Sequence, residues 1–124
     1  MAMENKYRDR NLARRRNIFN KTKGKCFYCG CVLDFSNFHI DHFVPKIHGG
    51  KDRNNVVPSC PDCNLIKSDL DIESFRSKIA SLIRTDIKGR IIAKYYPIKS
   101  TDIVFWFEEN TDEDLQEYIN NILE

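Results

Sequence analysis

Several features that mark other classes of protein are missing from this 124-residue sequence. It has no run of eighteen apolar residues, so no segment is long enough to cross a membrane as a helix. The basic N-terminal stretch is not followed by an apolar segment, so we expect no secretory signal peptide and predict a cytoplasmic protein. Internal repeats and low-complexity linkers are also absent, and the length fits one domain.

Charge is distributed unevenly along the chain, although the net charge is only +2. Residues 1–25 contain nine Lys and Arg against two acids, whereas residues 101–124 contain eight acids and no Lys or Arg. A basic segment of this kind suits a polyphosphate partner. A solvated helix whose charge is balanced by the acidic tail explains the pattern equally well, so charge alone does not decide between the two readings.

The spacing of apolar residues and turn formers predicts a mixed order of helices and strands in the first part of the chain. We expect a basic helix over 5–21 and a strand pair within 31–44. A short strand or extended stretch over 55–58 should lead into a helix over about 60–70.

The sequence of the C-terminal part predicts a helix, a hairpin and a second helix. Asp71 suits the N-cap of the first helix, and Thr111 is expected to cap the last helix, which runs to about Leu123. Between them we predict two strands, over 90–98 and 102–108, whose aromatic side chains belong to the core.

Four of the five cysteines form two pairs of identical spacing. Cys26 and Cys29 are followed 31 residues later by Cys60 and Cys63. Two such pairs fit one tetrahedral Zn²⁺, because each short loop places two sulfurs near a single point. A disulfide protein is a poor alternative, since one cysteine is left over and no secretory signal is present. The leftover Cys31 is expected to be a packed or partly exposed thiol.

Polar residues suited to hydrolytic chemistry lie in the insert between the two cysteine pairs and just after it. His39 and Asp41 would share one face of a strand, with His42 next to them. Asn64 would lie one helical turn after Cys60 and would be anchored by the zinc. A carboxylate, an imidazole and a carboxamide would thus be fixed to one metal-braced frame.

Over residues 26–67 the chain resembles the HNH endonuclease superfamily. The matched positions, in chain order, are Cys26, Cys29 and Gly30; Asp41, His42 and Pro45; Gly49 and Gly50; Asn55 and Pro58; and Cys60, Cys63, Asn64 and Lys67. The third signature position, which is histidine or asparagine in the family, is Asn64 here, so the chain would be the HNN variant of the pattern.

The resemblance implies a role for each matched polar residue. His42 would be the general base, and Asp41 and Asn64 would bind a catalytic Mg²⁺ or Mn²⁺ through hard oxygen atoms. Asn55 would hold the loop and orient the base. The implied reaction is hydrolysis of a DNA phosphodiester bond, and Lys67 is expected to meet a phosphate.

Each of these residues has an ordinary explanation when taken alone, and only the joint spacing favours catalysis. His39 lies outside the pattern and is either a third metal contact or, as we favour, a polar strand residue. The run of Arg14, Arg15 and Arg16 is expected to follow a DNA backbone. RNA stays open as a substrate, and the sequence does not fix the oligomeric state.

A non-catalytic zinc module that binds nucleic acid or protein is the alternative function. Such a module needs the four cysteines but has no use for Asp41, His42 and Asn64 together, so we favour the enzyme. The predicted fold is α+β: a zinc-bound ββα-metal core, treble-clef-like, flanked by helices and a second β-hairpin. We expect one domain over 1–124, made of the basic helix, a core over 26–70 and a helix–hairpin–helix extension over 71–124.

Overall fold

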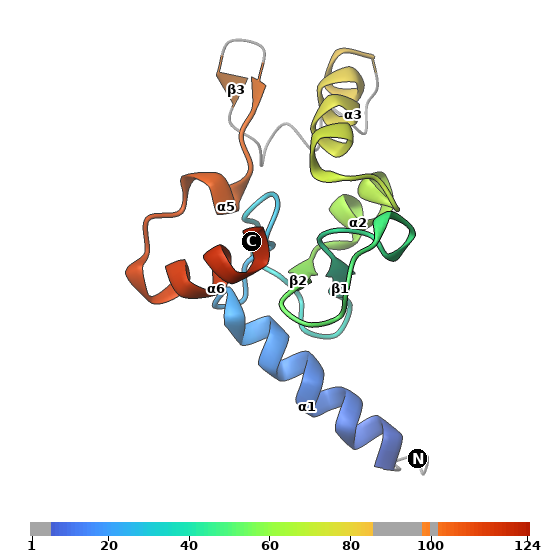
Figure 1. Cartoon of the computed structure of the whole chain (residues 1–124), viewed down its shortest axis with the longest axis vertical. Coiled ribbons are helices and arrows are strands. Elements are labelled where there is room, and N and C mark those ends of the chain that lie inside the picture. The colour runs from blue at the N-terminus through green and yellow to red at the C-terminus, as the bar shows by residue number, and fades with distance from the viewer. Residues whose placement is uncertain (1–5, 86–97, 100–101) are drawn as a thin grey trace.

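The computed structural model describes residues 6–85, 98–99 and 102–124. Helix α1 (Lys6–Lys21) projects from the rest of the molecule, and only its C-terminal end meets the core, where Ile18 is buried (Figure 1). The helix ends where Gly24, with a φ of 80°, donates its amide to the carbonyl of Phe19. A left-handed residue is a common helix terminator. The basic helix predicted over 5–21 is confirmed over its described residues, Lys6–Lys21.

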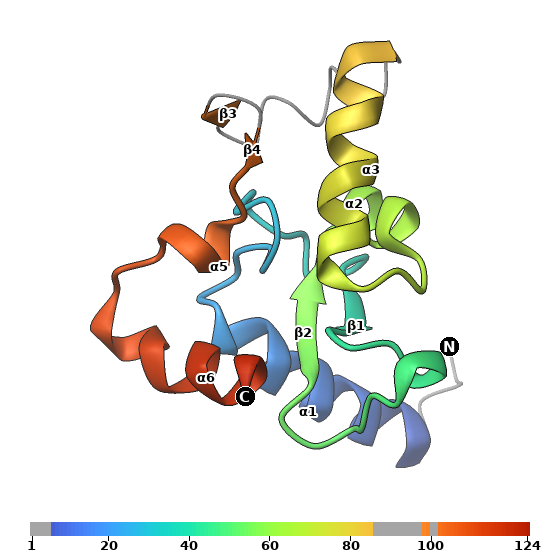
Figure 2. The ribbon, with the colours of Figure 1, turned by 45° about the horizontal axis from the view of Figure 1, so that its top comes forward.

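The centre of the fold is a two-stranded antiparallel sheet followed by a helix. Strand β1 (His39–His42) pairs with β2 (Val56–Ser59), and α2 (Pro61–Lys67) begins directly after β2 (Figure 2). The pairing places His42 opposite Val56. Between the strands lies a loop with one 3₁₀ turn, η1 (Lys46–His48).

The predicted strand pair within 31–44 is wrong. This stretch supplies only β1 and one isolated bridge between Lys25 and Val32. The residues before β1 form a turn instead, because the Asp34 carboxylate accepts hydrogen bonds from both the amide and the hydroxyl of Ser36. Such local side-chain bonds compete with strand pairing.

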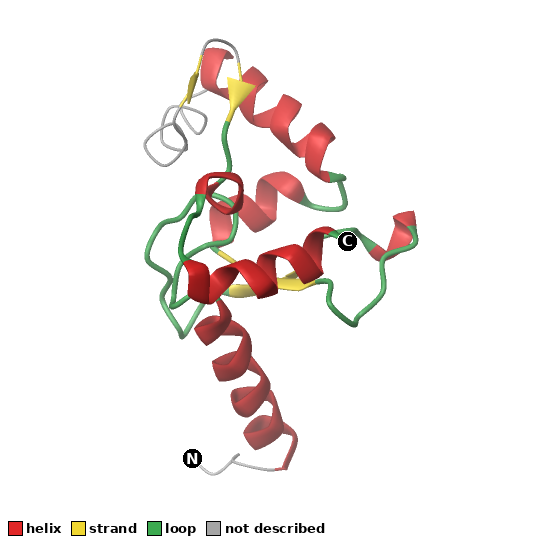
Figure 3. Cartoon of the chain, turned by 60° about the vertical axis from the view of Figure 1, so that its left-hand side comes forward, coloured by secondary structure: helices red, strands yellow, loops and turns green. Residues whose placement is uncertain are grey.

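The C-terminal extension contains two longer helices, α3 (Ile72–Thr85) and α6 (Glu113–Leu123). Asp71 caps α3 as predicted, since its carboxylate accepts the Ser74 amide at 2.8 Å. The predicted cap of the last helix is wrong by one residue: Asp112, and not Thr111, accepts the Asp114 amide. Helix α6 lies beside β2 and is joined to it by the Tyr118 hydroxyl, which donates to the Val56 carbonyl at 2.8 Å (Figure 3).

The predicted hairpin is much shorter than expected. Strands β3 (Ile98–Lys99) and β4 (Asp102–Ile103) pair as an antiparallel hairpin, and residues 90–97 lie outside the described part. The second predicted strand is wrong beyond Ile103, because Trp106–Glu109 forms the short helix α5. Its first turn is stabilised by Glu108, whose carboxylate accepts the amide of Phe105 at 2.9 Å.

Aromatic rings fill the core between these elements. Phe27 stacks on Phe107 at 4.7 Å between ring centroids, and Phe75 stacks on Phe105 at 5.3 Å. Phe105 and Phe107 are buried, so the prediction that they belong to the core is confirmed. None of the helices over the described residues is long and apolar enough to cross a membrane.

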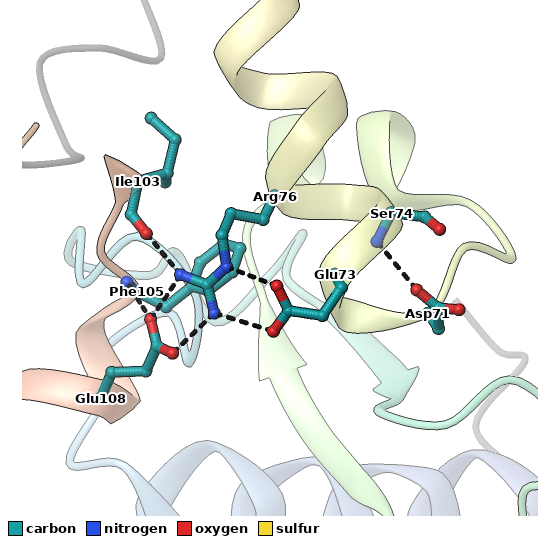
Figure 4. Close-up of polar contacts among 7 residues, drawn as sticks. All are labelled: Asp71, Glu73, Ser74, Arg76, Ile103, Phe105 and Glu108. Carbon is teal, nitrogen blue, oxygen red and sulfur yellow. Dashed lines mark hydrogen bonds and ion pairs between the residues drawn. The ribbon is translucent and has the colours of Figure 1, made fainter. Parts of the chain in front are cut away.

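A single arginine fastens α3 to the β4–α5 segment. Arg76 makes ion pairs with Glu73 on its own helix and with Glu108 on α5, and it also donates to the Ile103 carbonyl (Figure 4). Its guanidinium lies 4.8 Å from the centre of the Phe105 ring. The hydrogen bonds to Glu108 are the main cause of a raised Arg76 pKa.

Replacing Arg76 should therefore loosen the attachment of α3. We expect Arg76→Met to lower the free energy of unfolding by about 1–2 kcal/mol, because a partly buried charged hydrogen-bond network is removed. Lys78→Met, at an exposed position on the same helix, is the control and should change stability far less. Chemical denaturation of both variants checks this, and equal effects would contradict the role given to Arg76.

Candidate active site and metal centre

Four buried cysteines converge on one point. The sulfurs of Cys26, Cys29, Cys60 and Cys63 all lie within 4.8 Å of one another, and no disulfide joins any of them. The Cys29 and Cys60 sulfurs are 3.8 Å apart. A tetrahedral zinc with bonds of about 2.3 Å has sulfur–sulfur edges of about 3.8 Å. The donor set and its spacing therefore fit Zn²⁺.

Backbone hydrogen bonds hold both cysteine pairs in place. In the first pair, Gly30 has a φ of 79°, and its amide donates to the Cys26 carbonyl at 3.0 Å. A Cβ at Gly30 would lie 2.6 Å from the Trp106 ring, so a side chain there would collide. In the second pair, the Cys63 amide points at the Cys60 sulfur at 3.4 Å.

Amides that point at sulfur stabilise thiolates, the form that binds metal. The neighbouring thiols, Cys26 first, lower the Cys60 pKa. Cys31 lies outside the group of four and is half-buried, which fits a packed thiol.

Asp41 lines a surface pocket of about 310 Å³. Only 8% of its side chain is exposed. One carboxylate oxygen, Oδ2, accepts a hydrogen bond from the Tyr28 hydroxyl at 2.5 Å and lies 3.1 Å from the Lys67 ammonium. Among the described residues we find no hydrogen bond to the other oxygen, Oδ1. One oxygen of this carboxylate is thus held by the protein and the other is open to a ligand.

Burial, with the nearby Asp41 charge as a second cause, raises the Tyr28 pKa well above its usual value. Tyr28 therefore keeps its proton and acts as a donor to Asp41 at neutral pH. Sequence reasoning did not find this residue, because an aromatic residue between two zinc ligands looks like an ordinary core residue.

His42 lines the same pocket as Asp41 and is half-buried. Its Nε2 atom lies 2.8 Å from an oxygen of Asp52, which is exposed and also lies 3.4 Å from the Lys46 ammonium. The hydrogen bond with His42, and then the one with Lys46, lower the Asp52 pKa, so Asp52 is ionised at neutral pH. Asp52 was not predicted either, since only folding of the loop brings it to the histidine.

Asn55 holds the loop that carries Pro45 and Asp52 through side-chain hydrogen bonds. Its carboxamide accepts from the Val44 amide at 2.9 Å and donates to the carbonyls of Val44 and Lys51 at 2.9 and 2.7 Å. Gly50 is needed here, because a Cβ would lie 1.7 Å from the Val44 carbonyl oxygen. These contacts are those expected of a residue that holds the loop.

Asn64 and His39 lie farther from the pocket. Asn64 sits on α2, where its amide donates to the Cys60 carbonyl at 3.0 Å, and we find no hydrogen bond of its carboxamide to another described residue. It is half-buried and is not among the residues that line the pocket. His39 is exposed at the start of β1 and does not line the pocket, which fits a polar strand residue.

The placement of Lys67 corrects the expectation that it meets a phosphate. Its side chain is 0% exposed, and its ammonium donates to the His42 carbonyl at 3.0 Å as well as to Asp41. A group without accessible surface does not reach a phosphate from outside. In this structure Lys67 instead provides the counter-charge of a buried carboxylate.

The three arginines of the run Arg14–Arg16 fall into two kinds. Arg15 is half-buried: it donates to the Phe35 carbonyl at 2.8 Å and lies 4.1 Å from the centre of the Phe38 ring. Arg14 and Arg16 are exposed. Within this run, these two present their charge mainly to solvent.

Another groove, between α1 and α6, is larger, at about 610 Å³, but contains none of the predicted site residues. We place the chemistry in the smaller pocket, because a polymeric substrate needs an open surface with reactive groups and not a large cavity.

Comparison with known proteins agrees with this geometry. Residues 26–70 match the family model described as HNH endonuclease. A CRISPR-associated endonuclease Cas9 from Corynebacterium diphtheriae is 42% identical over 45 residues, which cover 35% of this chain and 4% of that protein. The similarity to HNH endonucleases thus lies in residues 26–70, about a third of the chain.

A solved structure has the same fold. The Type II-C Cas9 enzyme from Actinomyces naeslundii superposes with a TM-score of 0.55 at 20% identity, covering 92% of this chain and 11% of that one. The chain therefore spans only a small part of the length of the relatives it matches. The resemblance predicted from the spacing of the signature residues is confirmed.

The cysteine cluster predicts one tightly bound Zn²⁺ per chain. Cys60→Ser should lose the metal and unfold or precipitate, because the free energy of zinc binding is folding free energy at such a site. Cys31→Ser, which removes the neighbouring thiol outside the group of four, should keep both metal and fold. Elemental analysis and circular dichroism measure both outcomes, and a folded parent protein without zinc would refute the assignment.

Proposed function

We propose that this chain is a metal-dependent endonuclease that hydrolyses phosphodiester bonds in DNA. The observation that carries the proposal is the pocket that Asp41 and His42 line together, with one Asp41 oxygen held by Tyr28 and Lys67. These are the metal-ligand and general-base positions of the HNH pattern. Both are at the end of β1, which is braced by the zinc-binding helix behind it.

Asp41, which lines the pocket, would hold the catalytic ion together with Asn64, which the HNH pattern assigns as the second ligand although it lies on α2 outside the pocket lining. Carboxylate and carboxamide oxygens are hard ligands that suit Mg²⁺ or Mn²⁺, and two protein ligands leave positions for water and phosphate. When bound, such an ion stabilises the negative charge that grows on a phosphate oxygen and on the leaving 3′ oxygen. The open Oδ1 of Asp41 supports this assignment.

His42 would take the proton of the attacking water. An ionised carboxylate only accepts hydrogen bonds, so the contact with Asp52 requires a proton on Nε2 of His42. In neutral His42 the lone pair is then on Nδ1, which becomes the basic atom. A base whose other nitrogen is held by a third group is a common arrangement in hydrolytic sites.

Nucleic acid is the substrate class that the nuclease family supports, and exposed Arg14 and Arg16 would contact its phosphates. DNA is our choice between the two nucleic acids, and the cleavage assay below includes RNA. The alternative, a non-catalytic zinc module, does not account for a pocket lined by both Asp41 and His42.

The mechanism predicts different defects for the base and for the metal ligands. His42→Ala should slow plasmid nicking by roughly 10²–10⁴-fold, the usual contribution of a positioned general base, without loss of zinc or fold. Asp41→Ala and Asn64→Ala should also lose activity, but raising Mn²⁺ should partly restore it, since these changes weaken ion binding. Extra Mn²⁺ should not help His42→Ala.

The matched control for the base is His48→Ala, because His48 is an exposed histidine nearby whose ring bonds only the Asp69 carbonyl among the described residues. It should cut supercoiled plasmid at nearly the parent rate. A His42→Ala protein that is as active as the parent would refute the assignment of the base. If the parent cuts neither DNA nor RNA with any divalent metal, the non-catalytic zinc module becomes the better interpretation.

The two kinds of arginine predict two kinds of phenotype. If Arg14 and Arg16 each neutralise one phosphate, replacing either by Ala should reduce the slope of log affinity against log salt by up to about 0.9, because fewer counterions are released on binding. Arg15→Ala should mainly lower the melting temperature, because its contacts with Phe35 and Phe38 are internal. Fluorescence anisotropy at several salt concentrations tests this. Unchanged slopes for Arg14→Ala and Arg16→Ala would return these two residues to the alternative interpretation of a solvated helix face.

A further inference from the structure

Two buried side chains reach Asp41 from the two zinc-binding segments. Tyr28 lies between Cys26 and Cys29, and Lys67 lies four residues after Cys63, one turn farther along α2. Neither residue has measurable exposure to solvent. The zinc site therefore fixes the backbone from which each of them extends.

Both side chains bind the same carboxylate oxygen. The Tyr28 hydroxyl is 2.5 Å from Asp41 Oδ2, and the Lys67 ammonium is 3.1 Å from it. Lys67 also donates to the carbonyl of His42, so it fixes the backbone between the ligand and the base as well as the ligand itself. The carboxylate is thus prevented from rotating, and Oδ1 is the oxygen left for the pocket.

We propose that Tyr28 and Lys67 are positioning residues that connect the zinc site to the catalytic ion by presenting Asp41 as an anion with a single open oxygen. This inference rests on the proposed function, in which Asp41 binds the ion. Groups that hold a metal ligand in place typically contribute 10–100-fold to metal affinity or activity. The zinc would then tune ion binding in addition to stabilising the fold.

Tyr28→Phe tests the hydroxyl with almost no change in shape. We expect one zinc per chain and a normal circular dichroism spectrum, but about a 10–100-fold weaker affinity for Mn²⁺. Affinity is measured directly, by the electron paramagnetic resonance signal of free Mn²⁺, and also as the Mn²⁺ concentration that gives half-maximal plasmid nicking. At saturating Mn²⁺ the nicking rate should return to within a few-fold of the parent rate, because the base is intact.

Tyr118→Phe is the matched control. It also removes a tyrosine hydroxyl that donates a 2.8 Å hydrogen bond, but its acceptor is the Val56 carbonyl and not Asp41. It should leave the Mn²⁺ affinity unchanged even if the melting temperature falls. If Tyr28→Phe keeps the parent affinity for Mn²⁺, or if both variants lose affinity equally, the inference is refuted.

The role of Lys67 is tested by a double-mutant cycle with Asp41. Lys67→Met leaves the carboxylate buried without its counter-charge, so the melting temperature should fall sharply. Asp41→Asn in the same protein removes the charge that needs the lysine, so the double variant should recover part of the loss. Additive effects on the melting temperature would show that Lys67 does not serve Asp41.

Direct ion binding separates this inference from the proposed function. A parent protein that binds Mn²⁺ but does not cut nucleic acid would refute the nuclease proposal, and the comparison of Tyr28→Phe with Tyr118→Phe would still decide the role of Tyr28. A parent protein that binds no Mn²⁺ would refute the inference itself.

Discussion

The convergence of four sulfur atoms is the constraint on which the rest of the structure depends. It joins the loop around residue 27 to the first turn of α2. Cys29 in the loop and Cys60 at the start of the helix are 31 residues apart in the sequence. These contacts close the intervening residues into a loop, within which β1 and β2 pair with each other. The antiparallel register of β1 and β2 then decides that Asp41 points inward. The position of Asp41 in its pocket is thus a consequence of the cysteine cluster.

Burying Asp41 is costly for so small a domain, and the structure offsets that cost in one place. A carboxylate with 8% exposure loses most of its hydration, which a nearby cation and a strong donor replace. Lys67 and Tyr28 supply these, and both extend from segments that the cysteines already fix. A salt bridge of this kind contributes less to stability than to specificity of position, which is the property that a metal ligand needs.

The order of elements in the zinc-bound core could be predicted because it depends on local signals. The spacing within each cysteine pair and the Asp71 cap each act within a few residues, and both predictions agree with the structure. The errors arose where two local signals compete. Residues 102–108 have the β-branched and aromatic composition of a strand, but the Glu108 carboxylate accepts the Phe105 amide and starts a helix instead.

The residues that support the site could not be predicted, for a different reason. Tyr28 and Asp52 act through contacts that span 13 and 10 residues, and nothing in the sequence distinguishes them from a core aromatic residue and a loop acid. Lys67 was recognised as part of the motif, but its surroundings were assigned wrongly, because lysine is rarely buried. Sequence spacing shows which residues belong to a site. Which of them touch substrate and which touch one another depends on burial.

Asp41 and His42 are neighbours in the chain, yet the protein supports them in opposite ways. Asp41 is held by two buried groups that cannot move without disturbing the zinc site. His42 is held by Asp52, which is 72% exposed. The loop of Asp52 is held by a hydrogen bond from the Asn55 carboxamide to the Lys51 carbonyl. Under the proposed mechanism, the position of the ion would therefore be set when the protein folds, whereas the orientation of the imidazole would depend on an exposed loop that a bound nucleic acid would contact. Under the proposed mechanism, the ligand is preorganised and the base is adjusted last. Substrate binding would then act mainly on the proton-transfer step.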